Sequence, residues 1–211
     1  MKKCVIFAAV PIENADYIKI EEGAMVICAD RGVLTAKSLG IKVDFALGDF
    51  DSMDKSEIGE IPSVTFPSRK DDTDLMLAVK YGMQAGCEDF TIYGALGGSR
   101  LDHTYAALSV LAFLADNRLS GLLIDDKTCV KVLCAGEHIV ENLGGYLSLF
   151  PFGCDRALVS LSGTEYEGEA LLINSFPLGV SNEIKSDVAK IEVLSTEEEA
   201  RVLMIQTKKD N

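Results

Sequence analysis

The stretch VDFALGDFD, residues 43–51, changes from an apolar run to closely spaced carboxylates and is typical of a strand that ends at a site or turn. Asp49 and Asp51 stand two positions apart, and Asp54 follows shortly after. On an extended segment, residues i and i+2 point the same way, so Asp49 and Asp51 are expected to project together. Like charges this close repel unless a cation lies between them. The stretch is therefore either a solvated turn, common for Asp and Ser at strand ends, or a cation site.

Two continuous apolar runs precede this stretch, CVIFAAV at residues 4–10 and AMVICAD at residues 24–30. Such runs indicate strands that are buried on both faces. The segment RGVLTAKSLGI, residues 31–41, predicts a helix that ends at Gly40. The first third of the chain therefore alternates between strands and a helix.

The same alternation continues to residue 126. We expect strands at residues 63–67, 89–98 and 120–126, and helices at residues 71–86 and 102–117. This rhythm predicts an α/β fold with a Rossmann-like parallel sheet and helices on both faces. Ligands of such sheets bind beyond the carboxyl ends of the strands, where Asp30, Asp49, Asp51 and the Gly97–Gly98 pair are all expected to lie.

The texture changes after about residue 126. Short β-like runs occupy residues 128–136, 138–152, 157–163, 169–175 and 189–194, with turn residues between them. They predict an all-β domain of sandwich or barrel type. Residues 195–202, STEEEARV, are consistent with either a helix or a tight turn. The expected domains are residues 1–125 and 126–211.

The composition narrows the classes of partner and compartment. The chain has 211 residues and a net charge of −13, which disfavours a nucleic-acid backbone or an anionic membrane as partner. No apolar run approaches the ~18 residues of a membrane span, and residues 1–11 are predicted to be a buried strand rather than a signal peptide. Six cysteines without a CxxC pair and two histidines argue against a zinc site or a disulfide framework, so we expect a cytoplasmic protein.

The stretch SRKDDTDL, residues 68–75, combines cations with a helix start. Asp71 or Asp72 is the expected N-cap, and Asp74 is expected in the first helical turn. Arg69 and Lys70 come just before the helix, and cations next to free backbone N–H groups form a phosphate site. A well-capped helix and a phosphate site are both compatible with this pattern.

The stretch GALGGSRLDH, residues 94–103, offers a second combination of this kind. Glycines let the backbone approach a ligand closely, and Arg100 can hold a phosphate through two hydrogen bonds. Asp102 could bind a metal ion, whereas His103 at a helix start is more often a capping or packing residue than a catalyst. The pattern matches neither the dinucleotide-binding fingerprint nor the P-loop.

Taken together and in this order, three stretches resemble motifs of the thiamine pyrophosphokinase family. They are GDFDS at residues 48–52, KDDTD at 70–74 and GGSRLDH at 97–103, and LGVSNEI at 178–184 is similar to the family's C-terminal SN motif. The resemblance implies an α/β domain that binds ATP, followed by a β-sandwich domain that binds thiamine and forms a homodimer with sites between the subunits. It implies Mg²⁺-dependent transfer of pyrophosphate from ATP to thiamine, giving thiamine diphosphate and AMP.

The resemblance also implies roles for individual residues. Asp49, Asp51 and Asp74 would hold Mg²⁺, and these three with Arg100 and Asp102 would form the catalytic set. The implied ATP-binding residues are Asp30, Arg31, Gly32, Arg69, Lys70, Asp71, Thr73, Gly97, Gly98 and His103. Ser181 and Asn182 would meet thiamine, and Asp74 or Asp102 would accept the proton of its hydroxyl.

The chain departs from the family pattern at several points. Arg31 stands where a glycine is common, Ser99 is an extra residue in the GGRxDH pattern, and the chain has no tryptophan. Phe176 or Tyr166 is therefore expected to replace tryptophan as the aromatic partner of the thiamine ring. The open alternatives are a pyrophosphokinase for another hydroxymethyl acceptor such as a pterin, a Mg²⁺–nucleotide binding module, and a two-metal hydrolase.

Overall fold

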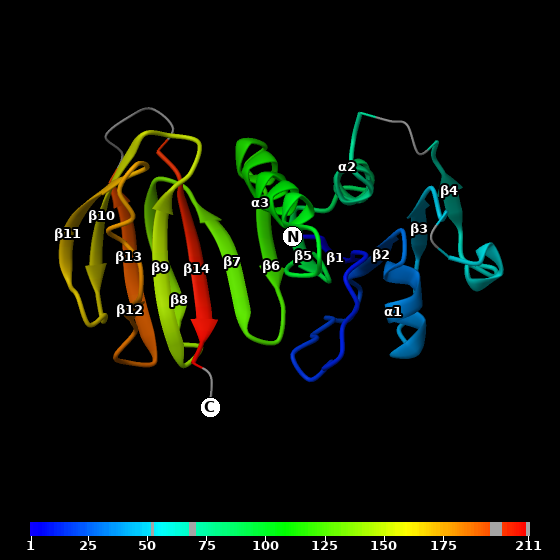
Figure 1. The fold of residues 1–211 in the computed structure, drawn as a ribbon, viewed down its shortest axis with the longest axis horizontal. Coiled ribbons are helices and arrows are strands. Elements are labelled where there is room, and N and C mark those ends of the chain that lie inside the picture. Colours follow the sequence, from blue (N-terminus) through cyan, green and yellow to red (C-terminus); the bar gives the residue numbers. More distant parts are fainter. Residues whose placement is uncertain (52, 68–70, 195–199, 210–211) are drawn as a thin grey trace. The chain divides into compact units, whose positions relative to one another are not determined.

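The computed structural model describes residues 1–51, 53–67, 71–194 and 200–209, and it consists of two compact units (Figure 1). The first unit spans residues 1–126 and the second spans residues 127–211. Within the described residues, no helix is long and apolar enough to cross a membrane.

The first unit is built on a parallel sheet. Its strands are β1 (Lys3–Phe7), β2 (Met25–Ala29), β3 (Phe45–Gly48), β4 (Ser63–Thr65), β5 (Asp89–Tyr93) and β6 (Ser120–Ile124). They lie side by side in the order β6-β5-β1-β2-β3-β4, and every neighbouring pair is parallel. The chain builds outward from β1 to β4 and then returns to place β5 on the other side of β1. The order of the strands thus reverses between β1 and β5, which is where such sheets form their ligand crevice.

Three α-helices and one short 3₁₀ helix connect these strands. They are α1 (Gly32–Ser38), η1 (Lys55–Glu57), α2 (Asp74–Gln84) and α3 (Leu101–Asp116). Helix α1 covers one face of the sheet, because its Val33 and Ala36 share a buried cluster with Val5 and Phe7 of β1. Successive side chains of a strand point to opposite faces, so Cys4 of β1 belongs to the other face.

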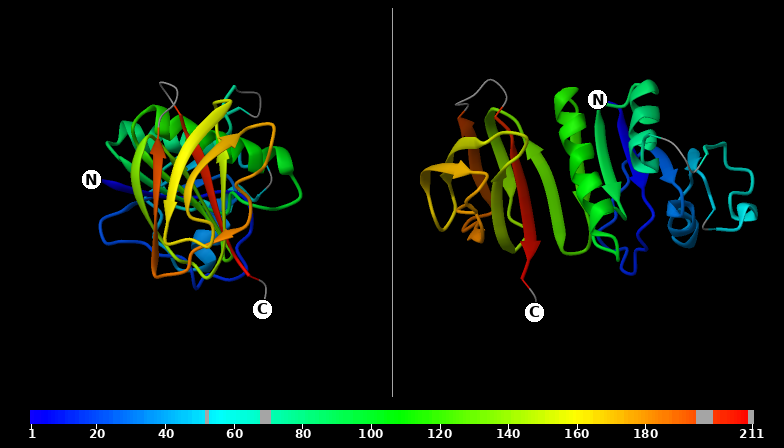
Figure 2. Two further views of the ribbon diagram at one scale, coloured as in Figure 1. Left: turned by 90° about the vertical axis from the view of Figure 1, so that its left-hand side faces the viewer. Right: turned by 45° about the horizontal axis from the view of Figure 1, so that its top comes forward.

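Helices α2 and α3 cover that other face and contact each other (Figure 2). At Gly82 of α2, an added Cβ atom would lie 2.7 Å from Cε1 of Phe90 in β5 and 3.2 Å from Sγ of Cys4. At Gly121 of β6, it would lie 2.7 Å from Cδ1 of Leu114 in α3. The predicted parallel sheet with helices on both faces is therefore confirmed.

The second unit is a β sandwich. Its strands are β7 (Thr128–Leu133), β8 (Gly136–Glu141), β9 (Gly145–Pro151), β10 (Arg156–Ser162), β11 (Gly168–Ile173), β12 (Asn182–Glu183), β13 (Val188–Leu194) and β14 (Val202–Lys208). One layer has the order β12-β9-β14-β7 and the other β11-β10-β13-β8, with antiparallel pairs in both. Buried residues such as Leu149, Val159 and Ile191 form one cluster between the layers. The prediction of an all-β sandwich or barrel is confirmed.

Two strands of this unit are absent from the sequence-based prediction. Strand β14 pairs with both β7 and β9, and its apolar run is buried between them and the opposite layer. Strand β12 is only two residues long and has no sequence pattern of its own. The predicted run at residues 138–152 is divided into β8 and β9 by a turn, in which the Gly144 N–H donates a hydrogen bond to Oδ1 of Asn142. Of the segment 195–202, residues 195–199 lie outside the described residues.

The packing of α2 on the sheet gives a first prediction. Gly82→Ala should lower the free energy of unfolding by about 1–2 kcal/mol, because the new methyl group overlaps the Phe90 ring. This loss should exceed the helix propensity that alanine adds, which is about 1 kcal/mol. Urea unfolding followed by circular dichroism measures the change. Gln84→Ala, at an exposed position of the same helix, is the control and should stay within about 0.5 kcal/mol of the wild type. A more stable Gly82→Ala variant would contradict the packing described here.

Candidate functional site

The loops that follow β1, β2, β3 and β5 approach one another closely at the carboxyl edge of the sheet. A Cβ atom added at Gly32 would lie 2.0 Å from the carbonyl oxygen of Phe7, and one at Gly94 would lie 2.7 Å from that of Val10. These distances leave no room for any side chain, so the backbone requires glycine at both positions. The segment after β1 is thus enclosed by the start of α1 and by the end of β5.

Backbone hydrogen bonds fix these loops beyond the ends of the regular strands. Ala8 N donates to the Tyr93 carbonyl oxygen at 2.8 Å, and Val10 N donates to that of Gly94 at 2.8 Å. On the other side of β1, Asp30 N donates to the carbonyl oxygen of Leu47 at 2.8 Å. The ladder therefore continues past the strand ends, and the loops form a rigid edge.

Strained backbone is concentrated in the motif residues. Four non-glycine residues in the described ranges have positive φ angles, and three of them are Asp30 (φ 49°), Phe50 (φ 53°) and Ser181 (φ 62°). The fourth, Arg118, follows the end of α3. A left-handed conformation at a residue with a side chain costs of order 1–3 kcal/mol, and it persists where surrounding structure or function requires it. This pattern supports a functional role for the Asp30, GDFDS and SN segments.

The turn after β3 separates a buried ring from two carboxylates. Phe50 is buried in the cluster under α1, whereas Asp49 is half-buried and Asp51 is exposed. Asp51 N donates a hydrogen bond to Oδ1 of Asp49 at 3.2 Å, as in an Asx turn. The buried Phe50 anchors the turn, and the carboxylates remain at the surface of the carboxyl edge.

The described residues contain no group of three or more His, Cys, Asp or Glu side chains close enough to hold a metal ion together. Asp49, Asp51 and Asp74 thus do not form a closed cage in this structure. Mg²⁺ usually takes only one or two carboxylates and completes its shell with water and substrate phosphates. The hard oxygen donors of this edge therefore fit Mg²⁺ that arrives with a phosphate ligand, and they do not fit a preformed metal site.

The start of α2 corrects one sequence-based prediction. The N-cap is Thr73, whose Oγ1 accepts a hydrogen bond from Met76 N at 3.2 Å, and not Asp71 or Asp72. Asp72 instead pairs with Lys80, Nζ to Oδ2, at 2.6 Å. Asp74 lies in the first turn as expected, and Asp71 is exposed. Arg69 and Lys70, the expected phosphate-binding cations, lie outside the described residues.

The start of α3 carries an exposed glycine pair. Gly97 and Gly98 have φ angles of 72° and 76°, and Oγ1 of Thr104 donates to the Gly97 carbonyl oxygen at 3.2 Å, tying the loop to the helix. The N-cap residue Arg100 makes no side-chain capping hydrogen bond. An uncapped helix start of this kind offers backbone N–H groups to an anion. His103 is exposed in the first turn of α3.

Arg100 and Asp102 form an ion pair at this helix start. Nε of Arg100 donates to Oδ1 of Asp102 at 3.2 Å, and Nη2 donates to Oδ2. The Arg100 guanidinium lowers the pKa of the Asp102 carboxyl, chiefly through this hydrogen bonding. Both side chains are more than half exposed, so the pair contributes little to stability. Arg31, at the start of α1, is exposed and makes no capping bond.

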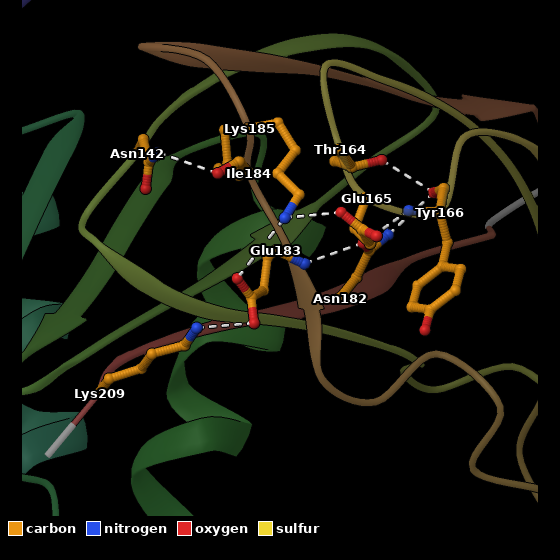
Figure 3. A network of polar contacts seen from close by, with 9 residues as sticks. All are labelled: Asn142, Thr164, Glu165, Tyr166, Asn182, Glu183, Ile184, Lys185 and Lys209. Atoms are coloured by element: carbon orange, nitrogen blue, oxygen red, sulfur yellow. Dashed lines mark hydrogen bonds and ion pairs between the residues drawn. The ribbon is translucent and has the colours of Figure 1, made fainter.

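In the second unit, the SN motif forms a buried polar contact (Figure 3). Oδ1 of Asn182 accepts hydrogen bonds from Tyr166 N at 3.0 Å and from Glu183 N at 2.8 Å, and its Nδ2 donates to the Tyr166 carbonyl oxygen at 2.9 Å. Ser181 is exposed, and its N–H donates to Oγ of Ser148 at 3.1 Å. Asn182 therefore joins the SN motif to the loop that carries Tyr166.

A cavity of about 380 Å³ lies beside this contact in the second unit. Its lining includes Leu149, Leu172 and Leu178, the Tyr166 ring, the Asn182 side chain and the acidic residues Glu167 and Glu169. The residues that line it include no lysine or arginine. The cavity was not predicted from the sequence, because its walls come from four separate segments and only Tyr166 and Asn182 were singled out. Its chemistry suits an apolar or aromatic ligand with positive charge.

Fold and site together define a class: an α/β protein with its ligand edge at the reversal of a parallel sheet, followed by a β sandwich. Residues 19–121 match the family model of the thiamin pyrophosphokinase catalytic domain. A thiamine pyrophosphokinase from Bacillus subtilis (strain 168) is 29% identical over 153 residues, which cover 69% of this chain and 71% of the relative. These matches confirm the resemblance to the thiamine pyrophosphokinase family.

Solved structures agree with this result. The crystal structure of thiamine pyrophosphokinase from Bacillus subtilis superposes with a TM-score of 0.87 at 24% identity, covering 99% of this chain and 100% of the other. That of a thiamin pyrophosphokinase family protein from Enterococcus faecalis gives a TM-score of 0.80 at 26% identity, with coverage of 99% and 100%. The α/β unit and the β sandwich are thus both parts of a fold that these proteins share.

The Arg100–Asp102 pair predicts a pKa change. Arg100→Gln should raise the pKa of Asp102 toward the ordinary aspartate value of about 3.9, because the guanidinium that stabilises the carboxylate is lost. A carboxyl with a lowered pKa stabilises the fold above its unfolded pKa, and this contribution disappears as the pH falls through the folded pKa. Carboxyl ¹³C chemical shifts measured during an acid titration give the pKa.

Asp54 is the internal control for this titration. Its pKa is also lowered, but by hydrogen bonds from Ser56, so it should not respond to the Arg100 substitution. An unchanged Asp102 pKa, or equal shifts at both residues, would show that the pair does not form in solution.

Proposed function

We propose that the protein is a thiamine pyrophosphokinase, which transfers the pyrophosphoryl group of ATP to the hydroxyl of thiamine and yields thiamine diphosphate and AMP. The observation that carries this proposal is the match of residues 19–121 to the family's catalytic domain. That range contains all three acidic and glycine-rich motifs, which the fold positions after β3, before α2 and before α3.

ATP is proposed to bind at the carboxyl edge of the parallel sheet. The Gly97–Gly98 loop and the uncapped start of α3 offer backbone N–H groups to its phosphates. Further proposed nucleotide contacts are Asp30, Arg31, Gly32, Arg69, Lys70, Asp71, Thr73 and His103. Thr73 already accepts a capping hydrogen bond, so we expect its contribution to be the placement of the helix start.

Asp49, Asp51 and Asp74 are proposed to hold Mg²⁺ together with the ATP phosphates. The ion would supply charge neutralisation for the transferred group. Arg100 can add to this by donating two hydrogen bonds to phosphate oxygens. Asp102 is the less suitable proton acceptor of the two candidates, because its lowered pKa makes it a weak base. Asp74 is therefore the proposed acceptor of the hydroxyl proton.

Thiamine is proposed to bind at the cavity of the β sandwich, with Ser181 and Asn182 at its border. Thiamine carries a positively charged ring, and Glu167 and Glu169 give the cavity a matching negative charge. A neutral pterin would gain less from these carboxylates, so the cavity favours thiamine over the alternative acceptor. Of the two aromatic candidates, Tyr166 lines the cavity and Phe176 does not.

We further propose a homodimer in the cytoplasm. Phe176, Leu178 and Val180 are 60%, 61% and 46% exposed on one segment of the β sandwich, and burial of such side chains stabilises protein interfaces. A cytoplasmic protein has access to ATP and to a reducing environment, in which the buried thiols of Cys4, Cys28 and Cys87 persist. Light scattering after size-exclusion chromatography tests the dimer.

The decisive experiment measures AMP release from ATP and Mg²⁺ with and without thiamine. Thiamine-dependent AMP, with thiamine diphosphate as the second product, is the expected result. AMP that appears only with a hydroxymethyl pterin would keep the reaction and change the acceptor. ATP binding without AMP release for any acceptor would favour a nucleotide-binding module, and release of inorganic phosphate would favour a hydrolase.

The carboxylates after β3 give a prediction for catalysis. Asp49→Asn should lower kcat by at least about 100-fold, because transition-state charge loses its main electrostatic partner. The free energy of unfolding should change by less than about 0.5 kcal/mol. Asp54→Asn, a carboxylate of the same stretch, is the matched control and should keep full activity. An unfolded Asp49→Asn variant would instead indicate a structural role.

The SN motif gives a prediction for the acceptor. Ser181→Ala should raise the KM for thiamine by about fivefold, the effect of one lost hydrogen bond, and leave the KM for ATP unchanged. Steady-state kinetics with each substrate varied in turn measures both values. Equal increases in the two KM values would remove Ser181 from the acceptor site.

A further inference from the structure

The loop that carries Tyr166 is held by an unusual share of the buried polar groups of the molecule. Among the described residues, three polar side chains are classed as buried, and two of them, Thr164 (5% exposed) and Asn182 (8% exposed), bind the Tyr166 backbone. Oγ1 of Thr164 donates to the Tyr166 carbonyl oxygen at 2.8 Å, the same oxygen that accepts from Nδ2 of Asn182. Buried polar groups are costly unless they are hydrogen-bonded, so these two side chains fix the peptide groups of Tyr166 strongly.

The flanking residues strengthen this fixation. Thr164 and Ile184 form an antiparallel bridge, Glu165 N donates to the Glu183 carbonyl oxygen at 2.8 Å, and Nζ of Lys185 pairs with Oε2 of Glu165 at 2.6 Å. Figure 3 shows these contacts between the SN segment and the Tyr166 loop. Two segments that are far apart in the sequence are therefore joined as one rigid unit.

The Tyr166 side chain takes no part in this network. Its ring is 72% exposed and lines the cavity of about 380 Å³, although its backbone is bound at both N–H and carbonyl oxygen. A rigid backbone with a solvent-exposed ring is the arrangement expected of a recognition residue, because the ring is already oriented before a ligand binds. Glu167 and Glu169 beside it favour a cationic ligand, and an aromatic face adds a cation–π contact.

We infer that Tyr166 determines acceptor specificity by contacting a heteroaromatic cation, and that Thr164 and Asn182 are positioning residues that act through Tyr166. This inference rests on the proposed function. It changes the role of Asn182, whose polar atoms bind the Tyr166 and Glu183 backbone. Asn182 thus contributes to acceptor binding by holding the ring in place.

The test is a double-mutant cycle with steady-state kinetics and calorimetric titration of thiamine. Tyr166→Ala should raise the KM and Kd for thiamine by about tenfold, and Tyr166→Phe should leave both within about twofold, because the ring and not the hydroxyl makes the contact. Thr164→Val should raise both by about fivefold, with kcat and the KM for ATP unchanged. Thr164→Ser, which keeps the hydroxyl, should restore the wild-type values.

The decisive comparison is the Thr164→Val substitution in the Tyr166→Ala background. A positioning residue should have no further effect there, because the ring that it positions is gone. An equal loss in both backgrounds, or a Tyr166→Ala variant with unchanged thiamine affinity, would overturn the inference alone. Thermal unfolding of each variant separates these results from misfolding, and Asn182→Asp offers a second route if Thr164→Val does not fold. A wild-type protein that neither binds thiamine nor releases AMP with it would overturn the proposed function and this inference together.

Discussion

The architecture of the first unit depends on the close approach of three backbone segments at the end of β1. Gly32 and Gly94 allow the start of α1 and the end of β5 to touch the segment after Phe7, so that chain segments on both sides of the reversal meet at one point. Without these contacts, the carboxyl ends of β2 and β3 would have no fixed relation to the glycine loop before α3. The positions of the acidic motifs thus follow from two residues that carry no chemistry themselves.

The two units hold their functional segments in different ways. In the α/β unit, the carboxylates and the glycine loop lie at an exposed edge, and the fixed parts are the backbone and the buried Phe50 ring. In the β sandwich, buried polar side chains fix the backbone, and the exposed part is an aromatic ring. An edge that binds phosphates gains from solvated, mobile charge, whereas a site for a rigid heterocycle gains from a preformed surface.

Much of the fold could be predicted from the sequence. The buried runs at residues 4–10 and 24–30 identified the parallel strands, because a continuous apolar run of that length has few other solutions. Strand β14 was missed because its apolar residues directly follow an acidic segment, and its place between β7 and β9 is set by tertiary contacts. The N-cap of α2 was misplaced by one or two residues because Asp and Thr cap equally well, and the pairing of Asp72 with Lys80 decides between them.

The site was predictable to the level of its motifs and not of its contacts. The pattern located Asp49, Arg100 and Asn182, but not that Arg100 pairs with Asp102 or that Asn182 binds the backbone of Tyr166. Those partners depend on side-chain orientation and on segments that are distant in the sequence. The cavity beside Tyr166 could not be predicted for the same reason.

The ion pair between Arg100 and Asp102 also has a consequence for selectivity among anions. An arginine that already holds a carboxylate offers little to chloride, sulfate or a single phosphate, because each must compete with a tethered partner of equal charge density. A polyphosphate with several negative groups can displace that carboxylate, since the exposed pair is worth no more than about 1 kcal/mol. The intramolecular pair therefore acts as a threshold, which common small anions do not cross and a nucleoside triphosphate does.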